Sequence, residues 1–170
     1  PSEVMPNQPI RYMFLQIGNN SNVALDSFCW RDTLPAQVTV NRLVTGTYNQ
    51  AQNYKIVYKV NGAGAYRTLA DNLSTTKNYV LDMRPAVIGL AANERVTEIM
   101  FVFGTVPAGF AQVETPVLYG TVCGGLSNGT NLVNSADAGG LYNGQWVQAV
   151  SRWLTTVYAK MTMTLPKTGY

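Results

Sequence analysis

Apolar and polar residues alternate along most of this chain, and short clusters of Gly, Asn, Ser and Pro interrupt the alternation. Within residues 53–60, for example, every second residue from Tyr54 to Val60 is apolar or aromatic, whereas Lys55 and Lys59 fall on the opposite face. A period of two residues predicts β-strands, and the turn clusters predict where the strands end.

The same pattern places short strands along nearly the whole chain. The expected strands are residues 9–17, 25–32, 37–48, 53–60, 65–69, 78–82, 96–103, 117–123, 130–137, 145–148 and 151–163. We expect a turn at Gly139-Gly140, and a single helical turn within residues 84–90, because Pro85 suits the first position of a helix.

About ten short strands with almost no helix predict an all-β protein, an antiparallel β-sandwich. Residues 9–163 would form this one domain, preceded by a linker at residues 1–8 and followed by a tail at residues 164–170. The period-two pattern predicts a core that includes Tyr12, Phe14, Phe28, Trp30, Val38, Val40, Ile56, Tyr58, Ile99 and Phe101.

The composition narrows the class of protein and its possible partners further. Only 12% of the residues are charged while 46% are hydrophobic, which argues against a disordered chain and against coiled coils. The net charge of +3 comes from 12 dispersed basic residues, so nucleic acid is not an expected partner. The chain has no apolar run long enough to span a bilayer.

The chain contains no histidine, which removes the Ser-His-Asp and Cys-His catalytic arrangements and most zinc and iron sites. The nine carboxylates do not cluster, so no local acid pair or calcium loop is visible. We therefore expect a protein that is not an enzyme and that binds no metal and no organic cofactor.

Two cysteines, Cys29 and Cys123, are too few for a disulfide framework. They are either two free thiols or, in an oxidising compartment, a single disulfide. The sequence leaves both alternatives open.

Two lysines within one expected strand, Lys55 and Lys59, have two possible explanations. A desolvated lysine beside a carboxylate could attack the side-chain amide of Asn134, with Asp32 or Glu98 as the acid, and form an intramolecular isopeptide bond. Alternatively, the lysines lie on a solvated or edge strand, where they deter edge-to-edge pairing.

The most specific motif lies at the end of the chain, where Leu165, Pro166, Lys167, Thr168 and Gly169 fit L-P-x-T-G, the sorting pentapeptide of Gram-positive surface proteins. A transpeptidase must reach the bond between the last two of these residues, so the motif must be extended and exposed. Pro166 favours an extended neighbour, and Gly169 leaves the backbone accessible.

The chain also resembles the conserved-repeat, immunoglobulin-like β-sandwich domains of Gram-positive cell-wall-anchored proteins. The resemblance rests on residues 10–25 with 30–35, on Asn134-Ser135-Ala136-Asp137, and on the pentapeptide at residues 165–169. The crosslinked relatives carry a lysine in an early strand before D-T-L. No lysine precedes Lys55 here, so we expect no crosslink.

This resemblance implies an immunoglobulin-like sandwich that is secreted, lies in the cell wall at the cell surface, and is a monomer. Its partners would be a sortase transpeptidase, which recognises residues 165–169, and peptidoglycan, to which the chain becomes covalently attached. The apolar stretch and basic tail of a sorting signal do not follow Tyr170, so we expect the sequence to be trimmed from a longer protein.

Two functions are compatible with such a domain. One is a non-catalytic stalk or spacer that presents the LPKTG signal, and the other is an adhesin module that recognises a host protein or glycan. A binding module should have a pocket or an exposed apolar or aromatic patch, whereas a spacer should have neither.

Overall fold

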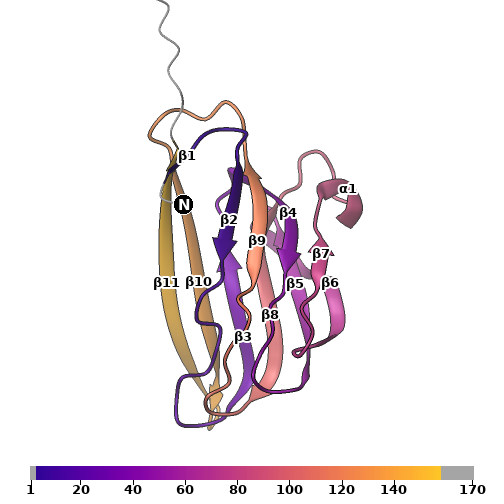
Figure 1. Cartoon of the computed structure of the whole chain (residues 1–170), viewed down its shortest axis with the longest axis vertical. Coiled ribbons are helices and arrows are strands. Elements are labelled where there is room, and N and C mark those ends of the chain that lie inside the picture. Colours follow the sequence, from indigo (N-terminus) through magenta and orange to yellow (C-terminus); the bar gives the residue numbers. More distant parts are fainter. Residues whose placement is uncertain (1–2, 158–170) are drawn as a thin grey trace, which may run out of the picture.

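Two β-sheets pack face to face in the computed structural model, which describes residues 3–157 (Figure 1). The large sheet has seven strands in the order β1 (Glu3–Val4), β11 (Gln145–Val157), β10 (Asn131–Tyr142), β3 (Leu25–Thr33), β8 (Val96–Val106), β5 (Asn53–Val60) and β6 (Ala63–Ser74). The small sheet has four strands in the order β2 (Pro9–Met13), β9 (Val117–Val122), β4 (Val38–Val44) and β7 (Val80–Asp82). The predicted all-β, immunoglobulin-like sandwich is confirmed.

Neighbouring strands pair antiparallel throughout, except that β1 runs parallel to the end of β11. Glu3 pairs with Thr156, and Val4 pairs with Val157. The first and last described residues therefore lie side by side at one end of the sandwich (Figure 1).

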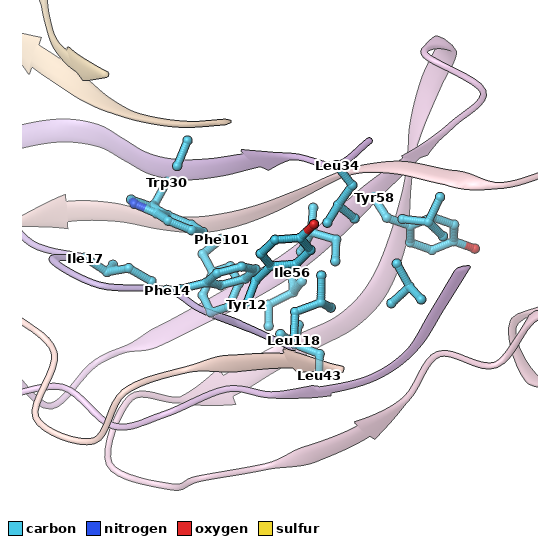
Figure 2. Close-up of a cluster of buried hydrophobic side chains, with 14 of the residues drawn as sticks. Tyr12, Phe14, Ile17, Trp30, Leu34, Leu43, Ile56, Tyr58, Phe101 and Leu118 are labelled. Carbon is cyan, nitrogen blue, oxygen red and sulfur yellow. The ribbon is translucent and has the colours of Figure 1, made fainter. Parts of the chain in front are cut away.

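The core fills the space between the sheets, and all ten residues predicted for it are buried, each at most 7% exposed. Figure 2 shows side chains from both sheets meeting there, with Trp30 and Phe101 from the large sheet and Leu43 and Leu118 from the small one. The ring of Phe14 lies between the sheets, 4.6 Å from the ring of Trp30 and 6.2 Å from that of Phe101. Such closely packed aromatic pairs add stability beyond the area they bury.

The prediction of a turn at Gly139-Gly140 is wrong. Strand β10 continues through both glycines, and the turn to β11 lies at Asn143 and Gly144, whose φ angles are 50° and 76°. A Cβ at Gly139 would collide with the indole of Trp146, so this position needs glycine for close packing within a strand, not for a turn.

The one predicted helical turn is confirmed as α1 (Pro85–Ile88), which begins with proline as expected. Strand β6 is longer than the predicted residues 65–69: it runs from Ala63 to Ser74 and continues past Asn72, whose φ is 52°. In the described part of the chain, no helix has the length and apolar character needed to span a membrane.

Candidate functional site

The outer face of the small sheet carries a row of charged and aromatic side chains, one from each strand. Arg11 of β2 and Arg42 of β4 both pair with Tyr119 of β9, and Asp82 of β7 pairs with Arg42. Since side chains at paired positions point to the same side of a sheet, these four form one continuous line across it. We call this line the charged row.

The adjacent line on the same face is entirely apolar. It consists of Met13, Val117, Val44 and Val80, which are paired across the same four strands. Met13 is 47% exposed and Val80 is 66% exposed, whereas Val44 and Val117 between them are half-buried. We call this line the apolar row; an exposed, continuous apolar line bordered by charges is typical of an interaction surface.

An open pocket of about 450 Å³ lies over the charged row. Its floor and walls include Arg42, Tyr119 and Asp82 of the charged row, Val80 of the apolar row, and Arg84 just after β7. A pocket beside a surface line of apolar side chains is expected of a binding module and not of a spacer.

The two arginines next to Tyr119 are available to a partner. The guanidinium carbon of Arg42 lies 4.1 Å from the centre of the Tyr119 ring, a cation–π contact that holds it over the pocket. Among the described residues, no carboxylate lies within ion-pair distance of Arg11 or Arg42.

Asp82, in contrast, is already neutralised. Arg84 Nη2 donates to Asp82 Oδ2 at 2.7 Å, and this hydrogen bond from Arg84 lowers the pKa of the Asp82 carboxyl. The β2–β9–β4 part of the face is thus the part with uncompensated positive charge.

Sequence reasoning did not find this surface. Arg11, Arg42, Asp82 and Tyr119 are scattered over more than one hundred positions, and only strand order and register bring them together. The available signal was an arginine at an outward-facing strand position, as at Arg11, which by itself indicates no more than a solvated face.

A second polar site is buried between the sheets. Asp32 of β3 is fully buried and Asn134 of β10 is 1% exposed, and Asn134 Nδ2 donates to Asp32 Oδ1 at 2.7 Å. Burial raises the pKa of Asp32 to about 8, although the hydrogen bond from Asn134 lowers it in part. The raised pKa favours the protonated, neutral form of Asp32 at pH 7.

The remaining oxygens of the pair support this protonation state. Asp32 Oδ2 and Asn134 Oδ1 are both buried and have no hydrogen-bond partner among the described residues. Two buried acceptors without donors are unfavourable, and a proton on Asp32 turns one of them into a donor.

An isopeptide bond needs an acid, an amide and an amine, and the structure brings together only the acid and the amide. Lys55 is exposed, and Lys59 lies on the outer face of the large sheet with its Nζ 4.4 Å from the centre of the Tyr66 ring. Asn134 points into the core. The other carboxylate considered, Glu98, accepts a hydrogen bond from the Tyr66 hydroxyl at 2.7 Å, also on the outer face.

Cys29 and Cys123 are free thiols in the structure, each half-buried. Cys29 lies on β3 in the large sheet, whereas Cys123 directly follows β9 in the small sheet. Burial raises the pKa of the Cys29 thiol, which disfavours its reactive thiolate form.

The predicted sortase motif, Leu165 to Gly169, lies outside the described residues, as does the end of the predicted domain at 158–163. Within residues 3–157, no group of three or more Cys, Asp or Glu side chains is placed to hold a metal ion.

Comparisons with known proteins give structural neighbours only. No protein-family model matches the chain, and no curated protein matches it. One similar solved structure is the collagen-binding subdomain of the Enterococcus faecalis surface protein ACE, at 10% identity and a TM-score of 0.41, covering 92% of each chain. Another is the collagen-binding domain of a Staphylococcus aureus adhesin, at 13% identity and a TM-score of 0.39, covering 93% of this chain and 94% of that one.

A third similar structure is AvmM, which catalyses macrocyclization in alchivemycin A biosynthesis, at 11% identity and a TM-score of 0.37, covering all of this chain and 88% of that one. The three neighbours thus include two surface-protein domains and one enzyme. Similarity at this level describes overall architecture and assigns no function.

Proposed function

We propose that this chain is a non-catalytic, adhesin-type binding module of a bacterial cell-wall-anchored surface protein, and that its partner binds across the outer face of the small sheet. The observation that carries the proposal is the pocket over the charged row, beside an exposed apolar row. A solvated sheet face has no need for a line of apolar side chains on all four strands.

The positions of the first and last described residues favour a binding module over a spacer. A spacer that carries other domains outward joins its neighbours most directly at opposite ends of the sandwich. Here Glu3 and Val157 lie at the same end, so the body of the sandwich projects to one side of the line that joins them. A module that projects in this way exposes both of its sheet faces.

The pentapeptide at residues 165–169 supports the anchored location. In this proposal a sortase-type transpeptidase cleaves between Thr168 and Gly169 and transfers the new acyl end to an amine of peptidoglycan. The protein is the substrate of that reaction, so none of its own residues needs catalytic chemistry.

Adhesion of displayed protein tests the binding function. The chain would be displayed on a Gram-positive host through a complete sorting signal, and adhesion to immobilised extracellular-matrix proteins, collagen included, would be measured. We expect the wild type to increase adhesion to at least one of them. The double variant Met13→Glu/Val80→Glu, which places charge in the apolar row, should abolish the increase.

The matched control is Val133→Glu/Val147→Glu, which replaces two exposed apolar residues of the large sheet, 39% and 46% exposed. It should adhere like the wild type. If the displayed wild type adheres no better than the host alone, the binding function is wrong and the spacer is the better description. An equal loss of adhesion in both double variants would mean that the binding site lies elsewhere.

A further inference from the structure

From the composition of the outer face of the small sheet, we infer that its partner is an extended protein segment with carboxylate side chains next to apolar ones. This inference rests on the proposed binding function and names the class of its partner. It is carried by the charges of the charged row and by the apolar row beside it.

The acidic part of the partner follows from Arg11 and Arg42. They stand on the two strands that flank β9, and strands are about 4.8 Å apart, so their Cα atoms are about 10 Å apart. Both guanidinium groups lack a carboxylate partner among the described residues. A guanidinium group binds a carboxylate through two parallel hydrogen bonds, which are stronger than neutral ones.

Tyr119 positions one of these groups in advance. Because Arg42 rests on its ring, less side-chain freedom is lost when a carboxylate binds. The two ends of the charged row differ in charge. Asp82 lies at the β7 end and is already paired with Arg84. The partner's carboxylates are therefore expected over β2, β9 and β4.

The apolar row selects a protein over a polyanionic glycan. Met13, Val117, Val44 and Val80 run parallel to the charged row, so a partner that reaches the arginines also covers these side chains. Covering apolar surface is favourable only when the partner is apolar there too, and a sulfated glycan presents charge along its whole length.

A second copy of this chain is a poor occupant for the same reason of charge. In a symmetric dimer formed through this face, the arginines of one copy would meet the same basic region of the other. Like charges facing each other oppose such a contact. The partner therefore has to supply the negative charge.

Selection from a random peptide library tests the inference. Phage-displayed 15-residue peptides would be selected in parallel against the wild-type chain and two charge variants. Arg11→Glu/Arg42→Glu reverses the charged row, and Lys55→Glu/Lys77→Glu makes the same change in net charge at two exposed lysines elsewhere. Circular dichroism and thermal unfolding would confirm that each variant is folded, with Arg11→Gln/Arg42→Gln as the substitute if the reversal unfolds the protein.

We expect wild type and Lys55→Glu/Lys77→Glu to enrich peptides with Asp or Glu next to Val, Ile, Leu or Phe. The variant Arg11→Glu/Arg42→Glu should instead enrich Lys and Arg, and should bind the wild-type peptides about tenfold more weakly or worse. With Arg11→Gln/Arg42→Gln, the acidic preference should disappear. Met13→Ser/Val80→Ser should lose the preference for apolar residues while retaining the acidic one.

Three outcomes would overturn the inference: no enrichment by the wild type, an acidic preference that the charge variants do not change, or binding of heparin in place of peptides. Adhesion is measured independently. If Met13→Glu/Val80→Glu abolishes adhesion while no acidic, apolar peptide is enriched, the binding function stands and the inferred partner class is wrong.

Discussion

The buried pair of Asp32 and Asn134 makes the stability of this protein depend on pH in an unusual direction. Most proteins lose stability on acidification, because their paired or hydrogen-bonded carboxylates have a folded-state pKa below the unfolded value. Here burial raises the folded-state pKa of Asp32 from 3.8 to about 8, so between these values the folded protein holds one proton that the unfolded chain has lost. The free energy of unfolding therefore falls as the pH rises.

The magnitude follows from the size of the shift. Each pKa unit corresponds to ~1.4 kcal/mol, so the free energy of unfolding should fall by ~1.4 kcal/mol per pH unit and by about 4 kcal/mol from pH 5 to pH 8. This is a large fraction of the 5–15 kcal/mol that is typical of a folded domain. Histidine is the side chain that ordinarily titrates in this pH range, and the chain contains none. No histidine therefore adds to the change in stability that is expected from Asp32.

Urea unfolding at half-unit steps from pH 5 to pH 8.5 measures this slope. The variant Asp32→Asn keeps the shape of the side chain and an acceptor for Asn134 but has no proton to lose, so its stability should be nearly independent of pH and should exceed that of the wild type at pH 8. Asp71→Asn, which changes an exposed carboxylate, should keep the wild-type slope. A wild-type stability that is constant or increases from pH 5 to pH 8 would refute the argument.

Three further predictions concern other parts of the chain. Intact-mass spectrometry should show no loss of ammonia, because the described lysines lie away from the buried acid–amide pair; a mass lower by one ammonia would demonstrate a crosslink. A housekeeping sortase with a glycine-based amine should modify the wild type but not Thr168→Ala, and an inert wild type with a protease-accessible tail would mean that the motif is fortuitous. Gly46→Ala should lower the free energy of unfolding, measured in urea, by about 2–4 kcal/mol, since Gly46 has a φ of +71° and an added Cβ would meet the Glu114 carbonyl and Pro116. Gly62→Ala, at a φ of +65° but in open space, should lower it by only about 1 kcal/mol. Equal losses of stability in the two variants would contradict the steric reasoning.

The strands and the core could be predicted from the sequence because alternation is a local property. In residues 53–60 the pattern identifies Ile56 and Tyr58 as core residues, and both are buried. The pattern fails where the backbone changes direction within an apolar run. Strict alternation through residues 9–17 would place Ile17 on the face opposite Phe14, yet both are fully buried, since β2 ends at Met13 and Gln16 adopts a φ of +64°.

The surface proposed for binding could not be predicted in this way. Arg42 lines up with Tyr119 only because the register between β4 and β9 shifts by one residue between Val40 and Arg42. Without that irregularity, Asn41 would take the place of Arg42 in the charged row. No local sequence pattern predicts such a shift in register. The buried acid was recognised only as one conceivable partner of Asn134, because its burial depends on β3 lying at the centre of the large sheet.

The side-by-side position of Glu3 and Val157 also has a mechanical consequence. In a longer chain under tension, a force that enters at Glu3 and leaves at Val157 crosses only the short β1–β11 ladder, and the body of the sandwich carries no load. When that ladder separates, the chain from Glu3 is pulled straight as far as Asn7, whose N–H donates to the Val122 carbonyl at 2.9 Å. Four extended residues release about 14 Å of chain.

The load then passes to β2, which is an edge strand of the small sheet and pairs only with β9 there. This strand carries Arg11 and Met13, one end of the charged row and one end of the apolar row. Separation of β2 would therefore remove part of the proposed binding face. When a longer chain is pulled through both Glu3 and Val157, the module would therefore loosen a partner bound to this face as soon as β2 separates from β9.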